Sequence, residues 1–199
     1  FCDDATEDIN CIYNICEDYY DINNDFNCSL NGSSPYQIGD YLSCETVQKE
    51  FGLCYPEDCD KTVKLADFEG KNILIIYEFD WWVNCFNDIS QLEEDIILEY
   101  IDHPDIAVIN VINDAPGGKS CEIWGTGDED YDNDDRVPII INETNFGEPG
   151  DFNNWFYNSG DWTAQYSSPW YIIIDSNFKY IDLLATKNEA LMKLEELLD

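Results

Sequence analysis

Residues 72–85 read NILIIYEFDWWVNC, and the strongest structural signals of the chain begin here. Its first part, Ile73–Phe79, is a nearly continuous apolar run, which is typical of a strand covered on both faces of a sheet. Apolar side chains then recur at helical spacing, so we expect a helix over residues 86–101 that packs on the sheet. Ile106–Ile112 is a second buried strand. Strand, helix and strand in this order predict a parallel pair with a right-handed crossover.

The segments on either side of this unit also carry structural signals. Residues 36–71 predict an opening hairpin followed by a short turn of helix, and Gly70 supplies the turn into the first central strand. Val137–Ile141 predicts a short strand, and Phe152–Tyr157 predicts a short helix lined with aromatic side chains.

The C-terminal part predicts a hairpin and a helix. Residues 167–184 read SSPWYIIIDSNFKYIDLL, which predicts a strand, a two-residue turn at Ser176-Asn177 and a return strand. Residues Thr186 to Glu189 have the form of a capping box, which marks the start of a helix. The apolar face of that helix consists of Leu191, Leu194, Leu197 and Leu198.

A buried strand that runs into W-x-x-x-C at a helix N-terminus, here Trp81 to Cys85, resembles the active-site segment of the thioredoxin-like superfamily. Residues 38–40 (IGD) and 64–71 (KLADFEGK) resemble the opening of its redoxin group, which includes secreted thiol-disulfide oxidoreductases and peroxiredoxins. Ser168-Pro169 looks like the cis-proline that precedes the family's fourth strand. The residues that follow are similar to the family pattern P-t-x-x-x-I-D-x-x-G-x-I.

This resemblance implies an α/β chain with a three-layer thioredoxin-like fold and a central mixed sheet over residues 36–199. Residues 113–136 would then be an acidic insertion within the domain. Residues 1–35 contain eight carboxylates and no Lys or Arg. We therefore expect an acidic, Cys-rich and irregular N-terminal extension that has no core of its own.

The expected site differs from the family pattern at its first cysteine. Dithiol members have W-C-x-x-C at this place, whereas here Trp82 stands where the first cysteine belongs. That cysteine is the attacking thiolate, so the usual dithiol reaction cannot begin without it. Cys85 matches the second, resolving cysteine. It also matches the peroxide-reactive cysteine of peroxiredoxins, although the Pro and Thr of their P-x-x-x-T-x-x-C pattern are missing here.

Cys85 is therefore a candidate catalytic residue only if the chain is an enzyme. The alternative, which we favour, is a half-cystine paired with Cys121 or with an N-terminal cysteine. Trp81 and Trp82 are candidates for a ligand platform, although core packing, or burial under the acidic insertion, fits the end of a central strand better.

The charge of the chain excludes several partners. The 199 residues carry a net charge of −34, from 43 acidic and 9 basic residues. Nucleic acid and anionic membrane surfaces would repel such a chain. No stretch approaches the roughly 20 apolar residues that a transmembrane helix needs, so membrane insertion is not expected. The first residue is Phe1 instead of Met, so we expect that a secretory signal has been removed and that the protein is extracellular or on the cell surface.

The nine cysteines fit an oxidising compartment better than the cytosol. Because their number is odd, at least one thiol is free or bonded to another chain. Zinc is not expected, because Cys54–Cys59 has no second knuckle and the single histidine, His103, is remote. The disulfide candidates are Cys2, Cys11, Cys16, Cys28, Cys44, Cys54, Cys59, Cys85 and Cys121.

Calcium and glycans are weaker candidates. Acidic residues of the insertion alternate as calcium ligands do, but position twelve of such a loop would be Ile139 instead of Glu, and a solvated charged loop is equally consistent. The candidate ligands are Asp128, Asp130, Asp132 and Asp134. The glycosylation sequons begin at Asn27, Asn31 and Asn142.

Three functions stay open from the sequence. The one that we favour is an extracellular structural or interaction module on a redox-degenerate thioredoxin-like scaffold. Its N-terminal extension would pack on, or crosslink to, copies of the same chain and so build a surface layer or filament. The second is a secreted thiol oxidoreductase or peroxidase that uses Cys85 alone, with Cys121 as a possible resolving thiol. The third is a calcium-binding module, and calcium is the only cofactor considered.

Overall fold

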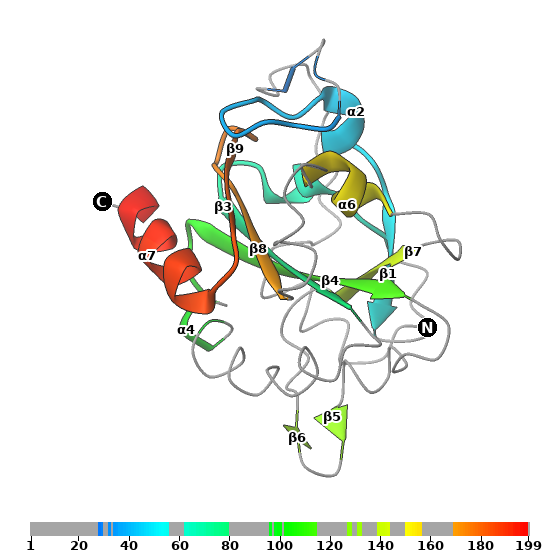
Figure 1. The fold of residues 1–199 in the computed structure, drawn as a ribbon, viewed down its shortest axis with the longest axis vertical. Coiled ribbons are helices and arrows are strands. Elements are labelled where there is room, and N and C mark those ends of the chain that lie inside the picture. Colours follow the sequence, from blue (N-terminus) through cyan, green and yellow to red (C-terminus); the bar gives the residue numbers. More distant parts are fainter. Residues whose placement is uncertain are drawn as a thin grey trace.

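The computed structural model describes residues 28–29, 32, 34–55, 62–79, 96, 98–100, 102–114, 127–128, 131–132, 139–143, 150–156 and 169–198. Seven of the described strands form one mixed sheet in the order β2-β1-β7-β4-β3-β8-β9 (Figure 1). These strands are β1 (Phe51–Tyr55), β2 (Thr62–Val63), β3 (Asn72–Phe79), β4 (Ile106–Asp114), β7 (Ile139–Glu143), β8 (Trp170–Ile174) and β9 (Tyr180–Leu184). The helices are α2 (Cys44–Val47), the 3-10 helix η1 (Leu65–Phe68), α4 (Leu98–Tyr100), α6 (Asp151–Phe156) and α7 (Lys187–Leu198).

The centre of the sheet is the parallel pair predicted from the sequence. β3 runs parallel to β4, with Asn72 beside Ile106 and Phe79 beside Asn113. On its other side β3 pairs with β8 in the antiparallel sense. Every residue of β3 except Phe79 is buried, which confirms the prediction of a strand covered on both faces. Of the helix predicted over residues 86–101, the described part is α4, together with the buried residue Ile96.

The opening of the domain also agrees with the sequence prediction. β1 and β2 pair as an antiparallel hairpin, η1 supplies the short helical turn, and Gly70 has a φ of +82°. A positive φ suits glycine because it has no Cβ to clash. The described strand β7 (Ile139–Glu143) includes the last three residues of the strand predicted over Val137–Ile141 and pairs in parallel with β4, while residues 137–138 lie outside the described part.

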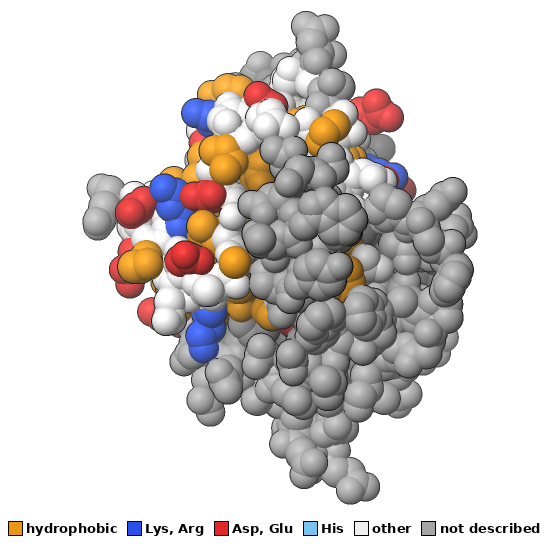
Figure 2. Space-filling model, viewed as in Figure 1, with side chains coloured by type: hydrophobic (Ala, Val, Ile, Leu, Met, Phe, Trp, Pro, Cys, Tyr) orange, Lys and Arg blue, Asp and Glu red, His pale blue; other side chains and the backbone are white. Residues whose placement is uncertain are grey.

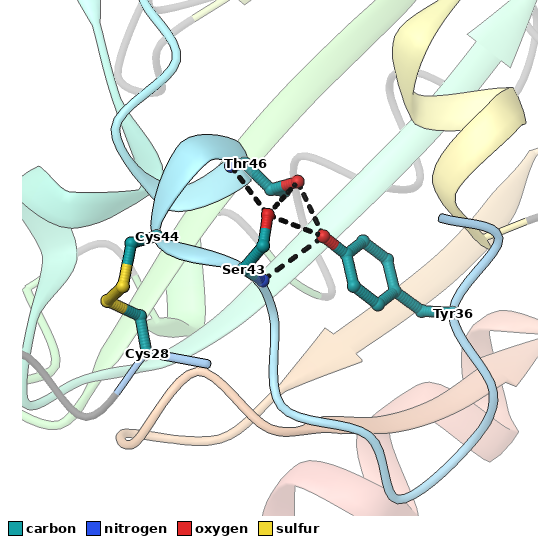
Figure 3. Close-up of a disulfide and its surroundings, with 5 residues drawn as sticks. All are labelled: Cys28, Tyr36, Ser43, Cys44 and Thr46. Carbon is teal, nitrogen blue, oxygen red and sulfur yellow. Dashed lines mark hydrogen bonds between the residues drawn. A yellow bond between two sulfur atoms is a disulfide. The ribbon is translucent and has the colours of Figure 1, made fainter. Parts of the chain in front are cut away.

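A short helix, α2, was not predicted, and a polar cluster holds it in place (Figure 3). Ser43 caps it by accepting a hydrogen bond from the N–H of Thr46 at 3.0 Å. The hydroxyl of the buried Tyr36 contacts the hydroxyls of Ser43 and Thr46 at 3.0 and 2.6 Å, and it accepts a bond from the N–H of Ser43 at 3.1 Å. A disulfide between Cys28 and Cys44 joins the chain before the domain to the first residue of α2.

The β8–β9 hairpin has a longer turn than the two residues predicted. The N–H of Phe178 donates to the carbonyl of Asp175 at 2.9 Å, so Ser176 and Asn177 are the central residues as expected. Phe178 follows with a φ of 60° before the return strand begins at Tyr180. It occupies the place where the family pattern has glycine, and it is only 1% exposed. Its burial offsets the steric cost of the left-handed conformation.

Helices cover the two faces of the sheet from opposite sides, with α6 and α2 on one side and α7 and α4 on the other (Figure 1). On the α6 side, aromatic rings meet: Phe156 contacts Tyr36 and Tyr180 at centroid distances of 6.0 and 5.1 Å, and Phe51 contacts Phe152 at 5.0 Å. A helix of six residues is too short to be stable by its own hydrogen bonds, so these contacts anchor it.

On the α7 side, Thr186 caps the helix as predicted, but only one of the two reciprocal bonds of a capping box forms, because the Glu189 carboxylate accepts from the Thr186 hydroxyl and not from its backbone N–H. The N–H of Glu189 donates to the Thr186 hydroxyl at 3.4 Å, and that hydroxyl donates to the Glu189 carboxylate at 2.7 Å. Leu194 is buried, whereas Leu198 is 37% exposed, so the prediction that Leu198 belongs to the apolar face was wrong. Because Leu198 is the last residue of α7, no following turn covers it.

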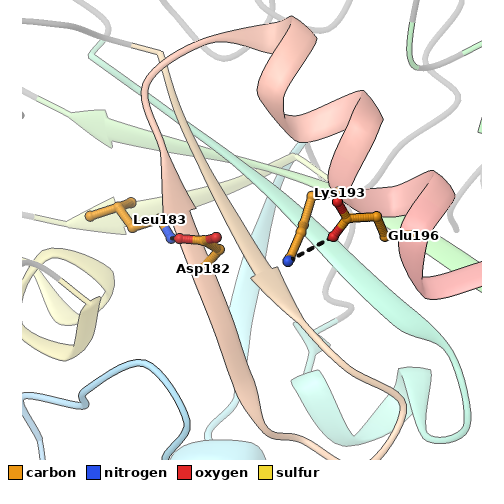
Figure 4. Close-up of polar contacts among 4 residues, drawn as sticks. All are labelled: Asp182, Leu183, Lys193 and Glu196. Carbon is orange, nitrogen blue, oxygen red and sulfur yellow. Dashed lines mark hydrogen bonds and ion pairs between the residues drawn. The ribbon is translucent and has the colours of Figure 1, made fainter.

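Charged side chains lie on the outer surface of α7. Lys193 donates to Glu196 at 2.9 Å (Figure 4). This hydrogen bond raises the pKa of Lys193, and the charge of Asp182 on β9 raises it further. Asp182 is in register with Ile173 of β8, which is in register with Leu74 of β3, so these three side chains lie on one face of the sheet.

Candidate functional site

The candidate site begins at the carboxyl edge of the central strands. β3 and β4 end side by side there, and the antiparallel β8 begins there, with Trp170 beside Tyr77. The segment 80–85, which holds Trp81, Trp82 and Cys85, follows the last residue of β3 directly. These residues and Ser168 lie outside the described part of the chain. Pro169 is described, is buried and directly precedes β8. The cis bond predicted before it involves Ser168 and stays a prediction.

Three aromatic rings and an amide occupy this edge on the α6 side. Tyr77 stacks on Trp170 with ring centroids 5.4 Å apart and an interplanar angle of 16°. Phe79 meets both rings edge-on, at 5.7 and 5.9 Å. The side-chain amide of Asn113 donates to the Tyr77 hydroxyl at 2.8 Å, which satisfies the polar end of the buried tyrosine. The edge from which the segment 80–85 departs is therefore a packed aromatic layer.

A carboxyl and an amide occupy the same edge on the α7 side. Glu78 is fully buried and Asn110 is 6% exposed. The Asn110 amide nitrogen Nδ2 donates to Oε2 of Glu78 at 2.8 Å. Sequence reasoning singled out neither residue, because 43 acidic residues offered no way to choose among them. The available signal was a polar residue inside each of the two apolar runs that form β3 and β4.

The cysteines are described in part. Cys28 and Cys44 form a disulfide, which confirms that both are half-cystines. Cys54 lies in β1, and its side chain lies outside the description. The predicted pairing of Cys85 with Cys121 or an N-terminal cysteine concerns residues outside the described part and stays a prediction. Nine cysteines less the two of this disulfide leave an odd number.

The candidate calcium ligands are also only partly described. Asp128 lies in β5 (Gly127–Asp128) and Asp132 in β6 (Tyr131–Asp132), and the two strands form a short antiparallel hairpin. Asp130 and Asp134 lie outside the description. Among the described residues, no group of three or more His, Cys, Asp or Glu side chains is placed to hold a metal ion. The calcium prediction is not tested by this finding.

The remaining candidates are the sequons and the histidine. Asn142 lies in β7, where its backbone is in register with Asn113. Asn27 and Asn31 lie outside the described residues.

His103 lies in the turn before β4, and its Nδ1 accepts the N–H of Asp105 at 3.2 Å. The described contacts of His103 are therefore local to this turn, with the backbone of Asp105 and the ring of Tyr100.

Four described lysines, Lys49, Lys64, Lys179 and Lys193, contact acidic or aromatic partners. Lys49 pairs with Asp151 of α6 and lies 5.8 Å from the ring centroid of Trp155, while Lys64 pairs with Glu50 at 3.0 Å. Acidic, basic and apolar side chains alternate over the α7 side of the surface (Figure 2). Among the described helices, none is long and apolar enough to cross a membrane.

No protein-family model and no curated protein matches the sequence of the chain. The fold is similar to many solved structures. The thioredoxin domain of a thiol-disulfide oxidoreductase from Bacteroides vulgatus is 14% identical, with a TM-score of 0.52, covering 82% of this chain and 99% of that one. A candidate protein disulfide isomerase from Bacteroides thetaiotaomicron is 18% identical, with a TM-score of 0.52, covering 81% and 88%.

A third similar structure is a cysteine-to-serine variant of PrxQ from Xylella fastidiosa. It is 13% identical, with a TM-score of 0.51, and the match covers 84% of this chain and all of that one. Identities this low establish the fold and not the activity. The strand order, the parallel β3–β4 pair and these similarities agree with the resemblance drawn from the sequence. The chain has a thioredoxin-like fold.

Proposed function

We propose that the protein is an extracellular interaction module built on a thioredoxin-like scaffold that has lost dithiol chemistry. The observation that carries the proposal is Trp82. In the dithiol members of this fold, the attacking cysteine follows the strand that corresponds to β3, and Trp82 stands in that position. An indole ring has no ionisable thiol, so it cannot attack a disulfide. The remaining Cys85 would be a structural half-cystine.

Cysteine usage supports a location outside the cytosol. The described disulfide fixes Cys28 to the start of α2, so the N-terminal extension leaves the domain at a defined point. Structural disulfides of this kind are typical of oxidising compartments. The similar structures include proteins named as disulfide exchange enzymes. That likeness supports a redox ancestry for the scaffold without assigning the activity to this chain.

The proposed partner is another copy of the chain. Seven cysteines remain after the Cys28–Cys44 disulfide, so at least one has no partner cysteine within the same molecule. Three of them, Cys2, Cys11 and Cys16, precede the anchored residue Cys28. An intermolecular disulfide from this extension would link subunits covalently. A net charge of −34 would oppose such contacts at low salt, so assembly should strengthen with ionic strength or calcium.

The test of lost dithiol chemistry is gain of function at Trp82. We expect the unaltered protein to show no turnover in a disulfide-reduction assay with a dithiol reductant. Trp82→Cys restores the Cys-x-x-Cys spacing with Cys85 and should produce turnover, while Trp82→Cys combined with Cys85→Ser should lose it. Trp82→Ser is the control for removal of the indole alone. Turnover by the unaltered protein that Cys85→Ser abolishes would overturn the proposal in favour of a single-cysteine enzyme.

Assembly is tested separately by non-reducing peptide mapping after alkylation of free thiols, together with analytical ultracentrifugation. A crosslinked peptide between two chains that involves Cys2, Cys11 or Cys16 would support the module. A monodisperse monomer at high concentration, with and without calcium, would overturn self-assembly. Calorimetry with millimolar calcium decides whether the acidic insertion binds that ion.

A further inference from the structure

Glu78 and Asn110 form a polar pair inside the α7 side of the core. In the register of β3 and β4, Asn110 stands beside Ile76, and Glu78 follows two residues later on the same face. Glu78 is 0% exposed. A buried ionised carboxylate is costly, and it persists only with strong compensation, whereas a neutral carboxyl needs only hydrogen bonds. The hydrogen bonds and charges around Glu78 therefore decide whether it is ionised or neutral in the folded protein.

The hydrogen bonds of Asn110 favour the neutral form. Its Nδ2 donates to Oε2 of Glu78 at 2.8 Å. Its side-chain oxygen Oδ1 is buried and has no hydrogen-bond donor in the described structure. A buried amide oxygen without a donor is destabilising, so such an atom is rare in a native core. A protonated carboxyl carries one hydroxyl donor, and an ionised one carries none.

We propose that Glu78 keeps its proton at neutral pH and donates it to Oδ1 of Asn110. The two planar groups then form a closed pair with two hydrogen bonds. One runs from the amide nitrogen of Asn110 to Oε2 of Glu78, and the other from the hydroxyl of Glu78 to the amide oxygen. No charge is buried, and the amide oxygen gains its donor.

Other titratable groups lie on this side of the sheet. Tyr171 of β8 is in register with Ile76. Burial raises the pKa of Tyr100 in α4, and the charges of Glu99 and Glu195 raise it further. Asp182 of β9 acts on Lys193, whose ammonium donates to Glu196. Glu78 also has an interaction beyond Asn110. The experiment must therefore separate a neutral Glu78 from an ionised one that these or other groups compensate.

A protonated Glu78 makes the stability of the fold sensitive to pH. An unfolded glutamate loses its proton near pH 4.3, whereas the folded one would retain it well above that value. Below about pH 4.3 both states are protonated and the pair contributes fully. Above it the folded state binds one more proton than the unfolded state, so the folding constant falls about tenfold per pH unit until the folded carboxyl ionises. Protonation of Glu78 thus stabilises the sheet at the edge where the candidate site begins.

The decisive variant is Glu78→Gln, because glutamine copies the proposed hydrogen bonds without a proton. Its amide nitrogen donates to Oδ1 of Asn110, and its oxygen accepts from Nδ2. We expect the folding constant of the variant relative to the unaltered protein to rise about tenfold per pH unit above pH 4.3. The matched control is Glu69→Gln, an exposed residue whose substitution removes one charge from the surface. It should leave the pH dependence nearly unchanged.

Either of two other results would overturn the proposal. A variant that loses stability relative to the unaltered protein as pH rises would show that Glu78 is ionised and compensated, and a constant difference would show that its pKa does not change on folding. If Glu78→Gln does not fold, infrared spectra of the unaltered protein with carbon-13 in its glutamate carboxyls decide. A carboxylic-acid band at neutral pH supports the pair, and its absence excludes it.

Discussion

Aromatic rings pack on the α6 side of the sheet, whereas a buried carboxyl and amide lie on the α7 side. Polar groups occur on both sides, but they are satisfied differently. On the α6 side, the Tyr36 hydroxyl has neutral partners in Ser43 and Thr46, so no proton needs to be gained or lost. On the α7 side, the hydrogen bonds of Asn110 depend on the protonation of Glu78. The stability of the α6 side therefore depends on packing, whereas the stability of the α7 side also depends on pH.

The largest effect is expected when the aromatic face loses a ring. Phe156→Ala removes a 2%-exposed side chain that contacts Tyr36 and Tyr180, and it should cost about 3–5 kcal/mol of unfolding free energy. Leu194→Ala, the matched change on the α7 side, should cost about 2–4 kcal/mol. Denaturant titration by circular dichroism measures both. The control is Met192→Ala, at a side chain that is 58% exposed. A smaller loss of unfolding free energy for Phe156→Ala than for Leu194→Ala would contradict the larger contribution expected from the aromatic face.

The next largest effect tests the neutral polar cluster. Tyr36→Phe keeps the ring and removes the hydroxyl that accepts the N–H of Ser43 at 3.1 Å. This N–H would be left buried without an acceptor, at a cost of about 1–3 kcal/mol. The loss should be the same at pH 5 and pH 8, because no partner titrates in that range. A loss that changes with pH would remove the distinction between the two faces.

Most of the layered fold was predictable from the sequence because its signals are local. The apolar runs of β3 and β4, the capping box at Thr186 and the aromatic helix α6 each carry a pattern within a few residues. α2 was missed because a helix of four residues has no periodicity, and its stability depends on Tyr36 and on the disulfide to Cys28. Ser43 is a local capping residue, but nothing in the sequence shows that Tyr36 and Cys28 contact this short segment.

The candidate site divides in the same way. The strand β3 that precedes the segment 80–85 could be predicted, because its apolar run is continuous in the sequence. The place of Trp82 itself stays a prediction. The pairing of Glu78 with Asn110 could not be predicted, because it depends on the register between two strands that are separated by about 30 residues in the chain. A polar residue in an apolar run indicates that it needs a buried hydrogen-bond partner, but only the register of the two strands identifies that partner.

A smaller effect is expected at the start of α7. Thr186→Ala removes the hydroxyl that accepts the N–H of Glu189, and the loss of an N-cap should cost about 1 kcal/mol. Asn188→Ala is the control, because its exposed side chain lies in the same first turn. Thermal unfolding measures both. An equal shift for the two variants would mean that the Thr186 cap contributes nothing to the α7 side.

The smallest effect at neutral pH is expected at Tyr180, whose hydroxyl lies 3.5 Å from the carbonyl oxygen of Phe156, a long hydrogen bond. Burial raises the pKa of Tyr180, and the charge of Asp182 raises it further. Above about pH 10 the unfolded state loses the phenol proton while the folded state keeps it, so stability should fall with rising pH by up to about 1.4 kcal/mol per unit. Tyr180→Phe should lower this slope, and Tyr41→Phe, at a ring that is 48% exposed, should not. Equal slopes in alkaline denaturation curves of the two variants would show that the aromatic face does not resist ionisation, and the contrast with the α7 side would then lie in Glu78 alone.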